Sequence, residues 1–215
     1  MKSILLVGLG KFGTCVAKEL SALKYEVLAV DKDENKVEDI LPYVTQSQIG
    51  NAVDIDFLES LGVKDFDICF VCFENDFQTS LEATCYLKDL GAKKVISRAM
   101  SDIHAKFLLS NGADEIIFPE KQLAKWTAIR YSSNNIYDYI EIDKTHAIYE
   151  VNVPDTWIGK TVGQIDIRKK YSINIVAIKN NDGLNMIIGT DTILNQEDKL
   201  LVLGDNKSIQ KIFHI

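Results

Sequence analysis

The stretch Ser3-Ile-Leu-Leu-Val7-Gly8-Leu-Gly10-Lys-Phe-Gly13 decides the fold that this sequence predicts. Its first five residues form an apolar run with the length of a buried strand, and three glycines spaced Gly-x-Gly-x-x-Gly follow at once. Apolar residues then recur at helical spacing: Phe12, Val16, Leu20 and Leu23. A strand that passes through such a turn into a helix typically opens a dinucleotide-binding βαβ unit.

The alternation of strand and helix continues to about residue 118. After Ser3–Val7 we expect strands at Glu26–Val30, Thr45–Ile49, Asp67–Phe73, Lys94–Ser97 and Glu115–Phe118. The predicted helices between them are the one after Gly10 and those at Asn35–Leu41, Asp54–Leu61, Asp76–Leu90 and Asp102–Ser110. Strands that alternate with helices are joined by right-handed crossovers, which give a parallel sheet covered on both faces. The expected fold class is therefore α/β, a Rossmann-like doubly wound parallel sheet.

A second, smaller domain follows a crossover helix at 119–130, which Pro119 opens and which carries Leu123, Trp126 and Ile129 on one side. These apolar residues need a surface to cover, which is either the chain's own sheet or a second copy of the protein. We assign residues 1–130 to the first domain and read Arg130–Asn135 as a linker.

The pattern of apolar and turn residues in 136–215 is typical of a small α+β domain. A helix is expected to open at Thr161, and Asn181-Asp182-Gly183 is a turn signal. The predicted strands are His146–Val153, Asn174–Ile178, Asn185–Ile188 and Leu200–Leu203. This domain is too small and too poor in nucleophiles to be catalytic.

The composition excludes several classes of function. The net charge of −7 in 215 residues argues against nucleic-acid binding, which needs clustered Lys and Arg. The longest apolar run, about Ile68–Phe73, is far short of the roughly 20 residues that span a bilayer, and no secretory signal opens the chain. We expect a cytoplasmic chain without direct membrane insertion, which lies at the inner face of the cell membrane through a separate partner.

The four cysteines include a Cys-x-x-Cys pair, Cys69 and Cys72, inside a predicted strand. Residues three apart in a strand point to opposite faces of the sheet, whereas a redox pair usually opens a helix. No second pair completes a zinc site. We therefore predict buried, inert thiols.

A nucleotide site is predicted at the carboxyl ends of the strands. Asp31 ends the second strand 18 residues after Gly13, close to the spacing of an acid that binds a ribose diol. Gly10 lets backbone N–H groups approach phosphate oxygens, and the helix that follows adds its positive N-terminal dipole. Ligands of open α/β sheets bind at this edge, where the strand-end residues are Gly8–Gly13, Asp31–Asp33, Gly50, Asn51, Phe73, Glu74, Arg98, Ala99, Pro119 and Glu120. Glu120 either holds a divalent cation at bound phosphates or is a first-turn acid favoured by its helix dipole.

Five segments in this order resemble the RCK family, which combines TrkA-N and TrkA-C domains, and within it the Ktr-type regulatory subunits. They are Gly8-Leu-Gly-Lys-Phe-Gly13, Glu26-Val-Leu-Ala-Val-Asp31, Gly50-Asn-Ala52, Ile117-Phe-Pro-Glu120 and Gly159-Lys-Thr-Val-Gly-Gln-Ile-Asp-Ile-Arg168. The resemblance covers essentially the whole chain.

The resemblance implies a site for ATP, ADP or NAD(H) in the first domain. In the turn Gly8, Gly10, Lys11, Phe12 and Gly13, it places Lys11 at the phosphates, where Ktr proteins usually have Arg. It further places Asp31 (with Lys32 and Asp33 beside it) at the ribose, and Gly50, Asn51, Phe73 and Glu74 around the base. Arg98 beside Ala99 would reach the phosphates with His104 nearby, and Glu120 would coordinate a divalent cation such as Mg²⁺. Glu74 differs from the small residue usual in the family.

The resemblance also implies the partners and a second ligand. Members form dimers and octameric rings under a membrane potassium-translocating subunit and regulate its pore, without being enzymes. In some members paired C-terminal domains bind cyclic di-AMP, and the corresponding residues here are Ile165, Asp166, Arg168 and Ile175. Arg168 would contact a phosphate and Asp166 an adenine. The alternative for the last two is a solvated surface ion pair.

Two other functions compete with this one. An NAD(P)-dependent oxidoreductase would need a general acid or base beside the nicotinamide, and the only histidines are His104, His146 and His214, with no partner evident for His104. A free-standing sensor of nucleotides or cyclic di-AMP that acts on a soluble partner would have the same sequence features.

Overall fold

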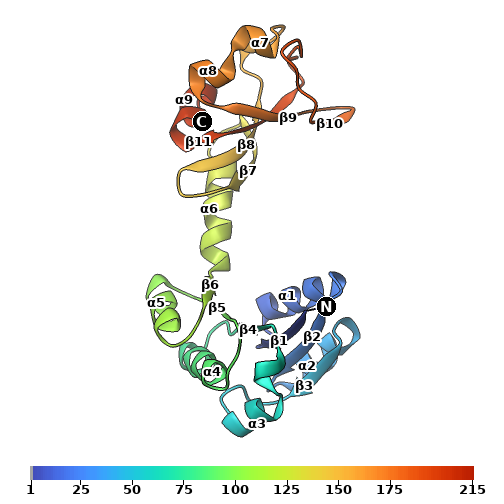
Figure 1. Cartoon of the computed structure of the whole chain (residues 1–215), viewed down its shortest axis with the longest axis vertical. Helices are drawn as coiled ribbons and strands as arrows, with labels where there is room; N and C mark the ends of the chain where they lie inside the picture. Colours follow the sequence, from blue (N-terminus) through green and yellow to red (C-terminus); the bar gives the residue numbers. More distant parts are fainter. Residues whose placement is uncertain (1) are drawn as a thin grey trace. The chain divides into compact units, whose positions relative to one another are not determined.

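The computed structural model describes residues 2–215, which divide between Glu120 and Lys121 into two compact units (Figure 1). Within the described residues, no helix is both long and apolar enough to cross a membrane. Each unit has its own sheet and its own core.

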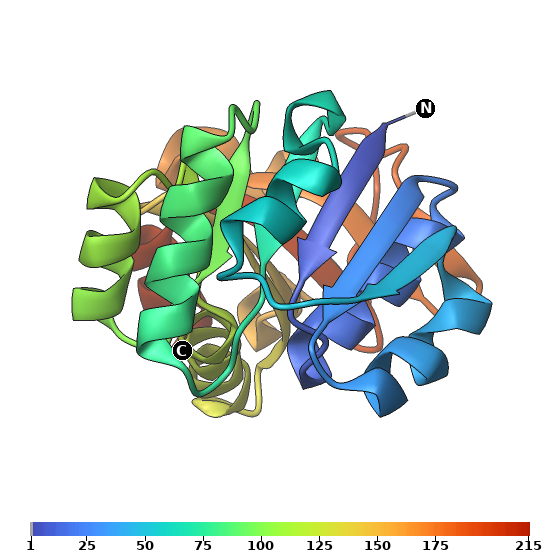
Figure 2. The same cartoon turned by 90° about the horizontal axis from the view of Figure 1, so that it is seen from below.

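The first unit is a six-stranded, fully parallel sheet. Its strands are β1 (Ser3–Val7), β2 (Glu26–Asp31), β3 (Gln46–Ile49), β4 (Ile68–Val71), β5 (Val95–Arg98) and β6 (Glu115–Ile117). Their order in space is β3-β2-β1-β4-β5-β6, so the direction of winding reverses between β1 and β4. Figure 2 shows β1 to β3 side by side, in blue to cyan. This is the doubly wound Rossmann topology, and the predicted fold class is confirmed.

Helices cover both faces of this sheet. They are α1 (Lys11–Ala22), α2 (Glu34–Ile40), α3 (Ile55–Ser60), α4 (Phe77–Asp89) and α5 (Asp102–Ser110). One apolar cluster joins the sheet to α1 and α2, and another joins it to α3 and α4. Successive residues of β1 alternate between the two clusters, with Leu5 in one and Leu6 in the other, as the period of a strand requires.

The same alternation explains the cysteine pair at the end of β4, where Cys69 lies in the strand and Cys72 directly follows it. Cys69 belongs to the cluster under α3 and α4, whereas Cys72 belongs to the one under α1 and α2. Both side chains are out of contact with solvent, at 0% and 1% exposure. The predicted buried thiols on opposite faces are confirmed.

Side-chain caps fix where two of these helices begin. Asp54 accepts from the Phe57 amide at 3.2 Å before α3, and Asp76 accepts from the Thr79 amide at 3.0 Å before α4. At the other end of α4, Gly91 has a positive φ of 87°, which suits the C′ position that ends a helix.

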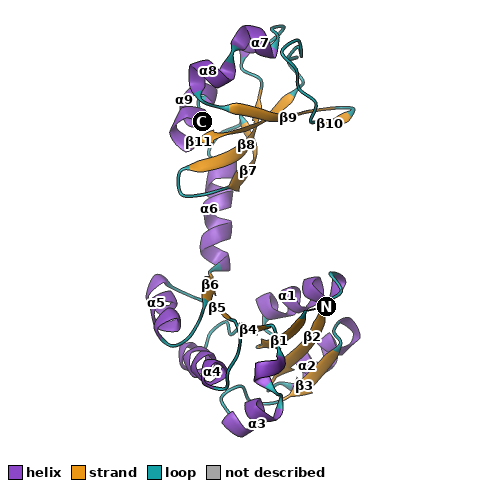
Figure 3. Ribbon diagram, in the orientation of Figure 1, coloured by secondary structure: helices purple, strands orange, loops and turns teal. Residues whose placement is uncertain are grey.

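The second unit is built on a five-stranded antiparallel sheet, in the order β10-β9-β11-β8-β7 (Figure 3). The strands are β7 (Ile136–Glu141), β8 (His146–Asn152), β9 (Asn174–Asn180), β10 (Gly183–Asn185) and β11 (Lys199–Asp205). The helices are α6 (Pro119–Tyr131), α7 (Val162–Ile165), α8 (Ile167–Tyr171) and α9 (Asn206–Phe213). Thr161 caps α7 with a reciprocal capping box, which confirms the predicted helix start.

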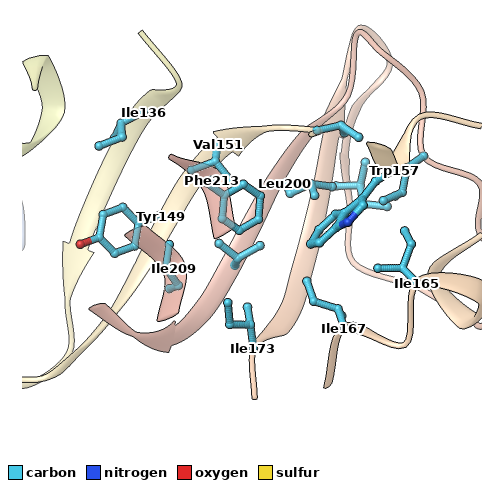
Figure 4. Close-up of a cluster of buried hydrophobic side chains, with 14 of the residues drawn as sticks. Ile136, Tyr149, Val151, Trp157, Ile165, Ile167, Ile173, Leu200, Ile209 and Phe213 are labelled. Atoms are coloured by element: carbon cyan, nitrogen blue, oxygen red, sulfur yellow. The ribbon is translucent and has the colours of Figure 1, made fainter. Parts of the chain in front are cut away.

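Aliphatic side chains together with a few aromatic rings fill the core of this unit (Figure 4). The rings of Trp157 and Phe213 meet edge to face with centroids 5.5 Å apart. Tyr149 packs on Tyr139 at 5.0 Å. On β8, alternate residues face this core and are buried, at Ala147, Tyr149 and Val151. The small domain therefore has a core that does not depend on the first unit.

The boundary between the two units differs from the one expected at residue 130, because α6 packs on the second unit. The two units separate between Glu120 and Lys121, and Trp126 and Ile129 of α6 pack against the core of the second unit. The indole of Trp126 donates to Asp138 Oδ1 at 3.1 Å, while Leu123 stays 63% exposed. We expected this helix to cover either the chain's own sheet or a second copy of the protein. It covers the chain's own antiparallel sheet and not the parallel one.

Two strands of the second unit differ from prediction. The strand expected at Asn185–Ile188 is instead β10 at Gly183–Asn185, because a two-residue turn after β9 starts the pairing at Gly183. Ile187 lies outside it and is 90% exposed. The sequence pattern did not predict β7. Its register shift between Ile136 and Asp138 buries Ile136 and Tyr139, three residues apart, so the alternation that identifies a strand is broken.

Burial predicts how the thiols react. It raises the pKa of both Cys69 and Cys72 to about 12, so neither has an appreciable thiolate fraction near neutral pH. Brief treatment of the folded chain with iodoacetamide should label the exposed Cys15 and spare Cys69 and Cys72. In urea all four cysteines should react. Peptide mass spectrometry measures this, and labelling of either strand cysteine at the rate of Cys15 in the folded chain would contradict the buried assignment.

Candidate functional site

The glycine turn between β1 and α1 is held by close backbone contacts. Gly8 has a φ of +94°, and its amide donates to the Val30 carbonyl at 2.8 Å. A Cβ placed on Gly13 would lie 2.0 Å from the Gly8 carbonyl oxygen, which no real side chain tolerates. Gly13 therefore lets α1 start directly against the end of β1, and the N-terminus of α1 faces the edge where the strands end.

Asp31, the predicted ribose acid, is buried at the end of β2, with only 8% of its surface exposed. Its Oδ2 accepts from the Leu9 amide at 2.7 Å, and its Oδ1 accepts from the Asp33 amide at 3.0 Å. Each carboxylate oxygen has a second lone pair, so a ribose hydroxyl can still donate to it. Asp31 thus has two functions open to it, because it positions the glycine turn and also borders the pocket.

A pocket of about 290 Å³ lies at this edge of the sheet. Of the predicted residues, Gly8, Gly10, Asp31, Lys32, Gly50, Asn51, Phe73 and Glu74 line it. They come from the ends of four strands, β1, β2, β3 and β4. The amide of Gly50 donates to the Asp31 carbonyl at 3.0 Å, which joins two of these strand ends. The structure therefore brings together the turn, the acid and the residues predicted around a base.

Arg98 and two carboxylates form a second group beside this pocket. The guanidinium of Arg98 forms an ion pair with Glu120 and donates to the Phe73 carbonyl at 3.3 Å. Its Nη1 also lies 4.0 Å from Glu74 Oε1. Arg98 is only 7% exposed, and its Nε has no hydrogen-bond partner among the described residues. Glu120 is thus paired with Arg98. Arg98 in turn lies 4.0 Å from Glu74, a residue that lines the pocket.

Glu74 reaches across the pocket to the start of α1. Its Oε1 accepts from the Phe12 amide at 3.0 Å, one residue into the helix. A Cβ on Gly10 would lie 2.6 Å from the carboxyl carbon of Glu74, so this side chain lies directly on the glycine turn. The carboxylate therefore occupies the place at a helix N-terminus that suits an anion.

The remaining predicted residues lie outside the pocket lining. Lys11 is exposed on the first turn of α1, and Phe12 packs in the core below it. Asp33 caps α2 by accepting from the Asn35 amide, and Ala99 is fully buried. His104 is also fully buried, where its ring stacks on Phe77 with centroids 4.5 Å apart and its Nδ1 accepts from the Met100 amide. Burial lowers the pKa of His104, which favours the neutral ring.

Sequence reasoning missed four polar residues of the pocket. Lys36 lies on the first turns of α2 with its Nζ 3.7 Å from Asp31 Oδ2, Asn75 lies in the loop before α4, and Asp76 and Thr79 come from the start of α4. None of the four is next to a strand end, which is where the sequence pattern placed the site. The helix that follows a strand begins at the same edge, so the residues of its first turn also reach the pocket.

The donor set does not form a metal site of its own. No group of three or more His, Cys, Asp or Glu side chains in residues 2–215 is placed to hold a metal ion. Glu120, the predicted ligand, is paired with Arg98. A cation at this edge would need most of its oxygens from a bound phosphate.

The residues predicted for a second messenger lie around the joint between α7 and α8. Asp166 has a positive φ of 52° at that joint, and Ile165 is buried. Arg168 donates from its Nε to Asn174 Oδ1 at 2.7 Å, and Ile175 is half-buried on β9. The expected alternative, an Arg168–Asp166 ion pair, is replaced by this hydrogen bond to Asn174.

Comparisons with known proteins agree along the whole chain. The family models for the TrkA-N domain and the TrkA-C domain match residues 4–119 and 146–215. The "Ktr system potassium uptake protein C" of Bacillus subtilis is 36% identical over 98% of this chain and 95% of its own. The "Ktr system potassium uptake protein A" of the same organism is 32% identical over the same shares.

The fold is shared with solved structures of a larger protein. The "GsuK Channel" has a TM-score of 0.71 at 16% identity, covering 98% of this chain and 38% of that one. The structure described as "GsuK channel bound to NAD" has a TM-score of 0.69 at 16% identity and covers 96% and 38% of the two chains.

The close approach at Gly13 gives a direct test of the turn. Gly13→Ala should lower the free energy of unfolding by roughly 1–3 kcal/mol, because the new methyl group would overlap the Gly8 carbonyl and force α1 away from β1. Gly189→Ala is the matched control, since no atom lies within 4 Å of a Cβ there. Urea unfolding followed by circular dichroism compares the two, and equal stabilities would mean that α1 does not approach β1 as described.

Proposed function

Because the chain belongs to the family that combines TrkA-N and TrkA-C domains, we propose that it is a nucleotide-binding regulatory subunit of a potassium uptake system. The observation that carries the proposal is the pocket at the strand ends, where the glycine turn, the N-terminus of α1 and the Asp31 carboxylate meet. The two relatives from potassium uptake systems extend over nearly the same length, so both parts of this chain have counterparts in them.

The ligand of this pocket is an adenine nucleotide: ATP, ADP or NAD(H). The ribose diol would donate to Asp31, and the phosphates would lie at the amides that open α1. Gly50, Asn51 and Phe73 would border the base, and Lys36 adds a cation at the rim that the sequence did not predict. Arg98, with its unpaired Nε, would turn toward the phosphates.

A divalent cation such as Mg²⁺ would accompany a ligand with several phosphates. Glu120 is the carboxylate that would share such an ion with the phosphate oxygens, once Arg98 has left it for the ligand. The cation would then belong to the complex and not to the protein alone.

The pocket supports a sensor better than an oxidoreductase. No histidine or tyrosine is among its lining residues within the described chain, and the nearest predicted histidine, His104, is buried in the core with a lowered pKa. A hydride-transferring enzyme needs a group that moves a proton at the nicotinamide. Turnover of NADH with a carbonyl substrate would overturn this part of the proposal.

The partner would be a membrane potassium-translocating subunit at the inner face of the cell membrane, with this chain on the cytoplasmic side. Copies of the chain would assemble as dimers and as an octameric ring, and exchange of the nucleotide would reshape that ring and change the activity of the pore. Co-purification with a membrane potassium-translocating protein tests the pairing. Co-purification with a soluble protein alone would favour a free-standing sensor.

Cyclic di-AMP is the ligand that we propose for the second unit. Arg168 opens a basic run, Arg168-Lys169-Lys170, in the last turn of α8, and its guanidinium is held in place by Asn174. A phosphodiester would bind this run, and Asp166 with Ile165 and Ile175 would meet an adenine.

The cyclic di-AMP site predicts a local mutational effect. Arg168→Ala should weaken the binding of cyclic di-AMP by about tenfold or more, because a hydrogen bond to a charged group is lost. Lys144→Ala, an exposed lysine on the turn between β7 and β8, is the control and should leave the affinity unchanged. Calorimetry on the full chain measures both. If the wild-type chain gives no heat of binding with cyclic di-AMP, the second unit does not bind this ligand.

The nucleotide site predicts a separate effect at Asp31. Asp31→Asn should weaken ATP, ADP or NADH binding by about 1.5–3 kcal/mol, which is tenfold to a hundredfold, because the charge of a hydrogen-bond acceptor is removed. Asp33→Asn keeps a cap on α2 and should bind as the wild type does. Titration calorimetry gives the affinities, and circular dichroism checks that each variant is folded. An unchanged affinity in Asp31→Asn would mean that the ribose does not bind this carboxylate.

A further inference from the structure

Glu74 places a negative charge where a nucleotide phosphate would bind. Its carboxylate accepts from the Phe12 amide at 3.0 Å, at the N-terminus of a twelve-residue helix. The side chain lies against Gly10 and lines the pocket. The same oxygen is 4.0 Å from Arg98 Nη1, the cation that is available for phosphates. A single carboxylate therefore engages both of the features that would attract a phosphate.

These contacts have a physical cost for an incoming anion. The free amides at the start of a helix and its dipole, about half a positive charge, stabilise one anion in the first turn. A phosphate and a carboxylate on the same amides would repel each other, and this repulsion is strong in a half-buried site where water screens poorly. The Glu74 side chain is 27% exposed, so it is partly shielded and still has solvent to turn into.

The rest of the loop allows that movement. Asn75 and Asp76, which follow Glu74, are exposed, and the hydrogen bonds that fix Asp76 are made to Thr79 of α4 and not to the glycine turn. Glu74 can thus leave α1 by rotating its own side chain. Phe73, whose carbonyl accepts from Arg98, and the cap of α4 can stay in place.

We propose that Glu74 is an internal competitor for the phosphate position and sets which nucleotides the pocket accepts. The proposal rests on the nucleotide site proposed above. A ligand that brings a phosphate to α1 must displace the carboxylate, whereas adenosine, which has no phosphate, binds with Glu74 in place. The residue therefore lowers affinity for phosphate-bearing ligands relative to the nucleoside, and it keeps α1 capped while no phosphate is bound.

The test compares ATP with adenosine in the wild type and in variants of the full chain. Glu74→Ala removes the competitor and should tighten ATP binding by about tenfold, the effect of one hydrogen bond to a charged group that no longer has to be broken. Glu74→Gln keeps the shape and an acceptor for Phe12 but loses the charge, so it should tighten ATP binding less. The ratio of the ATP affinity to the adenosine affinity is the readout, because general damage to the pocket lowers both.

Asp54→Asn is the matched control. It removes one negative charge from the loop after β3, at the same edge of the sheet, but Asp54 does not line the pocket, and its side chain accepts from the Phe57 amide of α3 and not from α1. Asparagine caps a helix about as well as aspartate does, so the start of α3 is kept. The ATP-to-adenosine ratio of this variant should stay within about twofold of the wild type, since Asp54 touches none of the amides that open α1.

The outcomes separate this inference from the function on which it rests. A ratio that rises in Glu74→Ala and Glu74→Gln but not in Asp54→Asn supports the competitor. A ratio unchanged in both Glu74 variants, with ATP still bound by the wild type, overturns the competitor and leaves the nucleotide site standing. An equal rise in Asp54→Asn also overturns it, because the effect would then come from the net charge of this edge and not from contact with α1. If ATP binds neither to the wild type nor to any of these variants, the nucleotide site itself fails.

Discussion

The buried carboxylate of Asp31 is the constraint on which the first unit depends. By accepting from the Leu9 amide it ties the end of β2 to the turn after β1, and the Gly8 amide returns a bond to Val30 of β2. A polar group buried this far from solvent costs stability unless it is hydrogen-bonded, and these amides supply the donors. The bonds fix the glycine turn, the turn aims α1 at the strand ends, and the pocket lies between them. The carboxylate proposed to bind a ribose is therefore also the one whose hydrogen bonds hold the glycine turn in position.

Most of the fold follows from local pattern. In the first unit β1, β2 and β4 are apolar runs, and the alternation of strands with helices favours a doubly wound parallel sheet even though β3 is mostly polar. The strands of the second unit were harder to predict, because where they begin and end depends on how they pair with one another. The bulge in β7 hides its alternation, and the position of β10 is set by the turn after Asn180 and not by the apolar residues that follow. The place of α6 depends on what Trp126 contacts, which spacing along a helix does not reveal.

The candidate site was predictable where it depends on topology and not where it depends on side-chain direction. The carboxyl ends of parallel strands must meet, so the sequence pattern alone places Gly8, Asp31, Gly50 and Phe73 together. Whether a strand-end residue then faces the pocket is decided by packing: Ala99 faces the core and Glu74 the glycine turn. His104 lies in the first turn of α5, and its ring is covered by Phe77, which its position in the sequence does not indicate.

The central claim is that a nucleotide binds at this edge with its phosphates on the first turn of α1. Hydrogen exchange of the full chain, measured by mass spectrometry with and without ATP, tests it directly, because it reports on the amides concerned. We predict slower exchange in peptides that contain Gly8–Gly13 and Phe73–Asp76, with no change in those that contain β7 and β8. Unchanged exchange across the glycine turn at a saturating concentration of ATP would contradict the claim.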